Sequence, residues 1–237
     1  MKKHISVIVF WGAAWGITEA TLGYVLHMMS FKIGWLFWFP LAFFFMNRVY
    51  KQTGKLSAIL FTCTIASGIK LTNLLLPVRI DKVINPAVSI IFEGIVLFVV
   101  LRIIENKHKN VNTASQVLEE AVPYCRFLWL FLISIAWKVL YIIYLLPLPL
   151  WMVSISPIRA IEPFCKFFFM ESALSAATIF VAMKAAKEIS ALGIESKILH
   201  KMFNNKAINL KNISKYAFRP IVSVGLLIFA IIIQWVL

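Results

Sequence analysis

Five ionisable residues stand inside long apolar stretches of this sequence, where a charge is costly unless another group pairs with it or water hydrates it. They are three carboxylates and two ammonium groups: Glu19, Lys70, Glu93, Lys138 and Glu171. Such groups can bind a charged ligand, relay protons, or neutralise one another inside a fold. Which chemistry applies depends on whether the segments that carry them bring the five side chains together.

These segments have the composition and length of transmembrane helices. The 237-residue chain is 61% hydrophobic and 14% charged, and its mean hydropathy is +0.87. A helix needs about 20 mostly apolar residues to cross the hydrocarbon core of a bilayer. We therefore predict an all-α, polytopic integral membrane bundle with six core helices and a seventh C-terminal one, over residues 5–27, 33–49, 56–77, 86–104, 126–149, 163–183 and 220–237.

The distribution of basic residues predicts the orientation. With a cytoplasmic N-terminus, 17 of the 24 Lys and Arg residues fall in cytoplasmic segments, which the positive-inside rule favours. The net charge of +14 is thereby explained by topology, without nucleic-acid binding. We predict a six-helix bundle over 1–183, a basic amphipathic connector on the inner leaflet over 184–219, and a last helix over 220–237 that ends outside.

Two helical hairpins, 56–104 and 126–183, share an order of polar residues and are predicted to be an internal repeat. Each has a lysine in its first helix, a proline and an arginine in the connection, and a glutamate in its second helix. The corresponding residues are Lys70 and Lys138, Pro77 and Pro157, Arg79 and Arg159, Pro86 and Pro163, and Glu93 and Glu171.

At 1.5 Å of rise per residue, all five intramembrane charges are expected at one depth, in the outer half of the membrane. Charges from several helices at one depth predict a polar pocket that opens outward and binds a substrate. The predicted substrate-binding residues are these five together with Asn73, Arg79, Asn85, Arg159, Glu162 and His27. The arginines suit a carboxylate or phosphate and the glutamates an amine or a metal, so the sign of the substrate stays open.

Pairing is the alternative to a pocket. In that interpretation Lys70 and Lys138 neutralise Glu93 and Glu171 and lock a structural subunit together, which leaves Glu19 without a partner. An ion-coupled secondary transporter that relays protons through the carboxylates is a further alternative, as is an intramembrane enzyme with a carboxylate as general base. No nucleotide-binding or hydrolase motif is present, so we expect no catalytic residue and no cofactor in this chain.

A stripe of small residues recurs every four positions on the first helix, at Gly12, Gly16 and Ala20. Small residues let another helix approach closely. The stripe is therefore expected to seat either an internal neighbour or a separate subunit.

One run of residues and three later positions carry a family resemblance: Trp15-Gly16-Ile17-Thr18-Glu19-Ala20-Thr21-Leu22-Gly23-Tyr24-Val25-Leu26-His27, then Lys70, Asn85-Pro86 and Glu93. This pattern resembles the S components, the substrate-binding membrane subunits of prokaryotic energy-coupling factor transporters. The resemblance implies capture of a vitamin, precursor or metal ion in the cytoplasmic membrane, and association with a transmembrane coupling subunit and ATPases. It also implies that Gly12, Gly16 and Ala20 contact that coupling subunit. The seventh helix is an addition to the six that are usual in that family.

Overall fold

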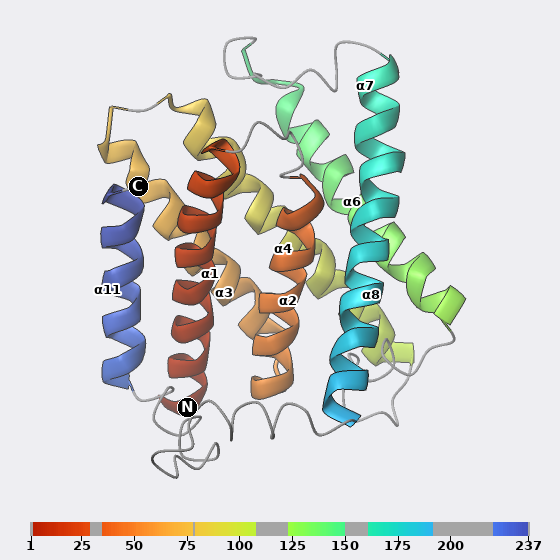
Figure 1. Cartoon of the computed structure of the whole chain (residues 1–237), viewed down its shortest axis with the longest axis horizontal. Coiled ribbons are helices and arrows are strands. Elements are labelled where there is room, and N and C mark those ends of the chain that lie inside the picture. The colour runs from red at the N-terminus through yellow and green to blue at the C-terminus, as the bar shows by residue number, and fades with distance from the viewer. Residues whose placement is uncertain are drawn as a thin grey trace.

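The chain forms a bundle of long helices in the computed structural model (Figure 1). The structure describes residues 2–28, 35–77, 79–107, 123–149, 161–191 and 220–236. Every regular element within these ranges is helical, so the predicted all-α class is confirmed. The elements are α1 (Lys2–Met28), α2 (Trp35–Thr53), α3 (Ser57–Leu71), the 3₁₀ turn η1 (Thr72–Leu75), α4 (Asp81–Lys107), α6 (Pro123–Leu145), α7 (Ile161–Cys165), the π-helical turn η3 (Lys166–Met170), α8 (Glu171–Ala191) and α11 (Pro220–Val236).

Five helical stretches in the described part of the chain are long and apolar enough to cross a membrane: His4–Leu22, Ser57–Leu75, Asp81–Asn106, Arg126–Leu145 and Pro163–Ala185. A shorter apolar stretch, Val222–Ile233, lies in α11. These stretches carry large apolar side chains that remain exposed on the bundle surface, such as Phe61, Ile143 and Val181. An apolar outer surface is what lipid contact requires, so the chain is a multi-pass helical membrane protein.

Most predicted segments differ from the observed helices by a few residues at their ends: α2 ends at Thr53 rather than at 49, and α6 ends at Leu145 rather than at 149. Two differences are larger. The fourth helix starts at Asp81 rather than at 86, and Pro86 lies inside it. An acidic residue in the first turn favours this earlier start, because it complements the positive end of the helix dipole. The sixth segment is not one regular helix, because the π-helical turn η3 separates α7 from α8.

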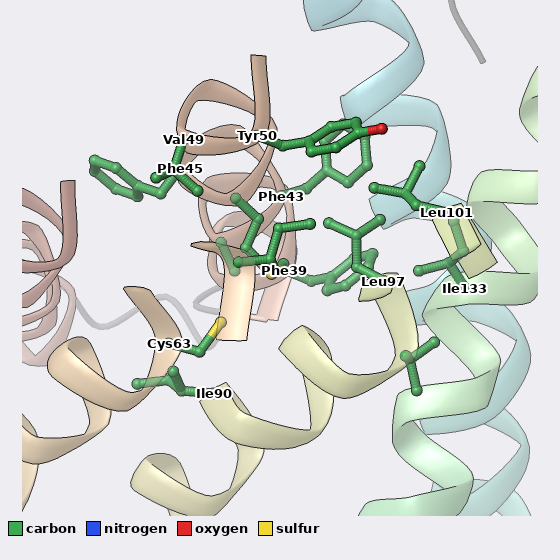
Figure 2. Packing of buried hydrophobic residues seen from close by; sticks show 14 of the residues in the cluster. Phe39, Phe43, Phe45, Val49, Tyr50, Cys63, Ile90, Leu97, Leu101 and Ile133 are labelled. Atoms are coloured by element: carbon green, nitrogen blue, oxygen red, sulfur yellow. The ribbon is translucent and has the colours of Figure 1, made fainter. Parts of the chain in front are cut away.

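The core of the bundle gathers around α2, which supplies a run of aromatic and aliphatic side chains (Figure 2). Met46 and Val49 are fully buried and Tyr50 nearly so. Their neighbours come from α3, α4 and α6 and include Cys63, Leu97 and Ile133. Long apolar side chains thus hold the central helices together by close packing, and α2 contributes no ionisable group to the intramembrane set.

The seventh helix packs beside α1 at the edge of the bundle (Figure 1). The Ser223 hydroxyl donates a hydrogen bond to the backbone carbonyl of Ser6 at 2.9 Å. One heptad further along each helix, Ala13 and Ala230 share a buried cluster with Ile69. The two helices therefore run parallel through small residues, a placement that the sequence left open. Which end faces the cytoplasm stays a prediction.

The predicted connector begins as part of a helix. α8 continues to Ala191, well beyond the predicted end of the sixth segment at 183. The remainder of the connector, 192–219, lies outside the described residues.

Candidate functional site

Lys138, on α6, is the centre of the intramembrane charges. Its side chain is only 3% exposed, and its Nζ lies 3.7 Å from Oε2 of Glu171 on α8. The same Nζ donates a hydrogen bond of 2.5 Å to the carbonyl of Phe167 and lies 4.6 Å from the centroid of the Phe167 ring. The ammonium group is thus held by a carboxylate, a carbonyl and an aromatic face at once.

The carbonyl that accepts this bond belongs to the π-helical turn η3. A π-helical turn departs from the regular backbone pattern of an α-helix, and such turns frequently mark functional sites. In this chain the turn places Phe167 and Glu171 on either side of the Lys138 ammonium. The sequence did not predict it, because no residue type specifies a π-helical turn.

Glu93, on α4, is a buried carboxylate without a direct partner. It is 5% exposed, and among the described residues it makes no hydrogen bond and no ion pair. Its electrostatic neighbours are Glu19 and Lys138. Gly94, the next residue, packs tightly against Cys63 on α3, because a Cβ at position 94 would lie 2.5 Å from the Cys63 sulfur.

Glu19 and Lys70 form a second group of charges. Glu19, on α1, interacts electrostatically with Lys70 on α3 and accepts a hydrogen bond from Trp15. Glu19 thus has an electrostatic neighbour in Lys70, although the two side chains form no ion pair within 4.0 Å in the described part of the chain. Among the described residues Glu93 makes neither an ion pair nor a hydrogen bond, and its nearest ammonium neighbour by electrostatic interaction is Lys138 of the other hairpin.

Lys70 and Glu93 do not lie at the single predicted depth. On α3, Cys63 is level with Gly94, and Lys70 lies two turns further on, about 10 Å along the axis. We call Glu19 and Lys70 the upper pair, and Glu93, Lys138 and Glu171 the Lys138 triad. The electrostatic interaction between Glu19 and Glu93 connects them.

Arg79, predicted to stand at the rim, is engaged by a residue that the sequence prediction missed. Its Nε and Nη2 donate to the two oxygens of Asp81 at 3.1 and 2.8 Å. The Arg79 side chain is 61% exposed and that of Asp81 only 3%. The signal was present in the sequence, since Asp81 follows Arg79 by two residues at the start of a helix.

The other predicted site residues are dispersed. Asn85 is buried on α4, where its Oδ1 accepts a hydrogen bond of 3.4 Å from the Tyr144 hydroxyl. Asn73 lies in η1, with a buried Oδ1 that has no hydrogen-bond partner. Arg159 lies outside the described residues, as do the side chains of Glu162 and His27.

Further polar atoms near Lys138 have no partner. The Ser134 and Ser172 hydroxyls and the Trp137 Nε1 are buried and make no hydrogen bond. Ser134 precedes Lys138 by one helical turn, and Ser172 follows Glu171 directly. Buried polar groups are normally satisfied by protein, water or ligand, so this cluster marks the α6–α8 seam as a place where polar atoms need partners.

The small-residue stripe is used inside the chain. A Cβ at Gly12 would lie 2.8 Å from the Ile65 side chain, and one at Gly16 would lie 2.7 Å from the Ile69 side chain. Both glycines are covered by α3, and Ala20 is 6% exposed. The structure therefore assigns the stripe to the α1–α3 contact and not to a partner subunit.

No group of three or more His, Cys, Asp or Glu side chains in the described ranges is arranged to hold a metal ion.

Comparisons of the chain with protein-family models, with curated proteins and with solved structures gave no match.

Proposed function

We propose that this chain is the substrate-binding subunit of a membrane transport system and captures a small polar nutrient among its intramembrane charges. In this proposal six core helices and α11 cross the cytoplasmic membrane of a prokaryote, with the N-terminus inside and the C-terminus outside. The support is the convergence of ionisable side chains from α1, α3, α4, α6 and α8 on one connected group.

One observation carries the proposal: Glu93 is buried, makes no ion pair within the described chain, and interacts with charges on two other helices. A group that only stabilises a fold is expected to be paired, because an unpaired buried charge costs several kcal/mol. A buried carboxylate without an ion pair is more consistent with a group that waits for a ligand.

The energy source belongs to other chains in this proposal. No nucleotide-binding motif occurs in the sequence, and the resemblance to S components implies a transmembrane coupling subunit and ATPases. With Gly12 and Gly16 covered by α3, the surface for such a subunit must lie elsewhere.

A second candidate is an ion-coupled secondary transporter. The observation in its favour is the interaction between the Glu19 and Glu93 carboxylates, because neighbouring carboxylates can share a proton and pass it on. Uptake into proteoliposomes that contain only this chain distinguishes the two functions. Uptake driven by a proton gradient without ATP supports the second candidate, and binding without uptake supports the first.

The binding function is tested by a thermal-shift screen of the purified protein against vitamins, precursors, amino acids, polyamines and divalent metals. A ligand of the folded state raises the unfolding temperature. We expect the shift to disappear in Glu93→Gln, to change in size in Lys70→Met, because loss of this ammonium alters the charge of the connected group, and to persist in Glu105→Gln. The last variant makes the same chemical change on α4, three turns away from the site. Equal affinity in all three variants would contradict the site.

A further inference from the structure

The two groups of charges differ in their balance. The upper pair has one carboxylate, Glu19, and one ammonium, Lys70. The Lys138 triad has two carboxylates and one ammonium. With all groups ionised, the triad lacks one positive charge. Since a net charge inside the membrane is costly, the deficit has to be met by a proton or by a bound cation.

The lysine of the triad already has two partners. Its Nζ lies 3.7 Å from Glu171 and donates to the Phe167 carbonyl. Glu93 has no ion pair within 4.0 Å among the described residues, although it interacts with Lys138 over a longer distance. The missing positive charge therefore belongs beside Glu93, in the α4–α6 seam.

The other groups in this region suit an organic ammonium ion. Ser134, on α6 one helical turn before Lys138, is a buried hydroxyl without a hydrogen-bond partner. The centroid of the Trp137 ring lies 5.8 Å from the Lys138 Nζ, and the Trp137 and Tyr141 rings are 6.2 Å apart. Aromatic faces attract cations, and the Phe167 ring already does so with the Lys138 ammonium at 4.6 Å.

An anion lacks comparable partners here. The Lys138 ammonium is engaged by Glu171, and Arg79 at the predicted rim is held by both oxygens of Asp81. A carboxylate or phosphate placed next to Glu93 would meet a like charge in a poorly hydrated interior.

We propose that the ligand of this site is a small organic ammonium ion whose charge is placed beside Glu93, between α4 and α6. This inference rests on the proposed function, since it names the class of nutrient that the same site binds. It also gives Lys138 a defined role: it fixes Glu171 and leaves Glu93 open for the ligand.

The test uses three probes of similar shape and different charge, each with the full chain in lipid nanodiscs at one pH: 2-phenylethylammonium, neutral 2-phenylethanol and anionic phenylacetate. We expect binding of the ammonium probe alone, measured by calorimetry and by thermal shift. Glu93→Gln is expected to weaken it at least tenfold, and Glu105→Gln to leave it unchanged.

The variant Lys138→Gln tests the sign of the charge on the ligand. Removing this ammonium makes the site more negative, so a folded Lys138→Gln protein is expected to bind the ammonium probe more tightly. If Lys138→Gln does not fold, Glu93→Gln decides the question alone.

Three results would overturn the inference: binding of phenylacetate in preference to the ammonium probe, ammonium binding that survives Glu93→Gln, or no binding of the ammonium probe. Failure of the inference is separable from failure of the proposed function by the wider nutrient screen. If an anionic or neutral nutrient binds and its binding requires Glu93, the transport proposal stands and the ammonium inference is rejected. If nothing in the screen binds, both are rejected.

Discussion

The α3–α4 and α6–α8 hairpins carry the same order of lysine and glutamate but use these residues differently. In α6–α8 the lysine reaches its own hairpin's glutamate, with Lys138 Nζ 3.7 Å from Glu171. In α3–α4 the lysine interacts instead with Glu19 on α1, and the glutamate interacts with Lys138 of the other hairpin.

The packing of each hairpin explains the difference. α3 and α4 meet through small residues, where Gly94 lies against Cys63 and the Ser67 hydroxyl donates to the Ala87 carbonyl at 2.9 Å. That register sets Lys70 about two turns away from Glu93. In α6–α8 the π-helical turn and the Lys138 ammonium join the helices instead. A shared order of residues along the chain therefore does not ensure shared partners in space.

The largest expected effect is that of Lys138→Met. It leaves the buried Glu93 and the partly buried Glu171 without their ammonium, so we expect a loss of about 3–5 kcal/mol in the free energy of unfolding. Lys70→Met affects a partly exposed lysine whose carboxylate partner keeps its bond from Trp15, and is expected to cost about 1 kcal/mol. Unfolding in mixed micelles by titration with sodium dodecyl sulfate measures both. Equal losses would contradict the difference between the hairpins.

The tight contact of the first hairpin is tested by Gly94→Ala. The new Cβ would lie 2.5 Å from the Cys63 sulfur, so we expect a loss of about 1–3 kcal/mol by overpacking. Gly68→Ala on α3 is the matched control, because a Cβ there has no atom within 4 Å and the stability should not fall. The same titration compares the two; a Gly94→Ala protein as stable as wild type would show that this contact has room to spare.

Double-mutant cycles test the pairing itself. We expect a coupling energy of about 1 kcal/mol between Lys70 and Glu19, and nearly none between Lys70 and Glu93. The Lys138–Glu171 pair should couple more strongly than either, because its charged atoms lie only 3.7 Å apart. Coupling of Lys70 to Glu93 but not to Glu19 would restore the interpretation in which each hairpin neutralises itself.

The smallest effects distinguish two serines. Ser67→Ala removes a buried interhelical hydrogen bond in α3–α4 and is expected to cost about 1 kcal/mol. Ser172→Ala in α8 removes a buried hydroxyl that has no partner in the unliganded chain, so it should be neutral or slightly stabilising. If instead Ser172→Ala destabilises the unliganded protein, its hydroxyl has a partner such as bound water.

Much of the fold could be predicted from the sequence, because the length of an apolar segment follows directly from the thickness of a bilayer. The positions of Glu93 and Lys138 inside their helices were predictable for the same reason. The partners of these residues were not. The pairing of Glu19 with Lys70 depends on how closely Gly16 lets α1 approach Ile69, and this is a property of packed surfaces.

Two features of the site differ in whether they could be predicted from the sequence. The Arg79–Asp81 pair was visible in the sequence, because the residues are two positions apart at a helix start. The π-helical turn of Lys166–Met170 was not visible, because its backbone pattern depends on the contacts around it and not on a local residue type.

The parallel contact between α1 and α11 has a consequence for biosynthesis. Ser6 and Ser223 are 217 positions apart, so α1 is synthesised and inserted long before its neighbour exists. Until α11 is inserted, the face of the bundle around Ala13 and Ile69 lacks its helical neighbour and is open to lipid. The contact between α1 and α11 can thus form only after the helices between them have been synthesised.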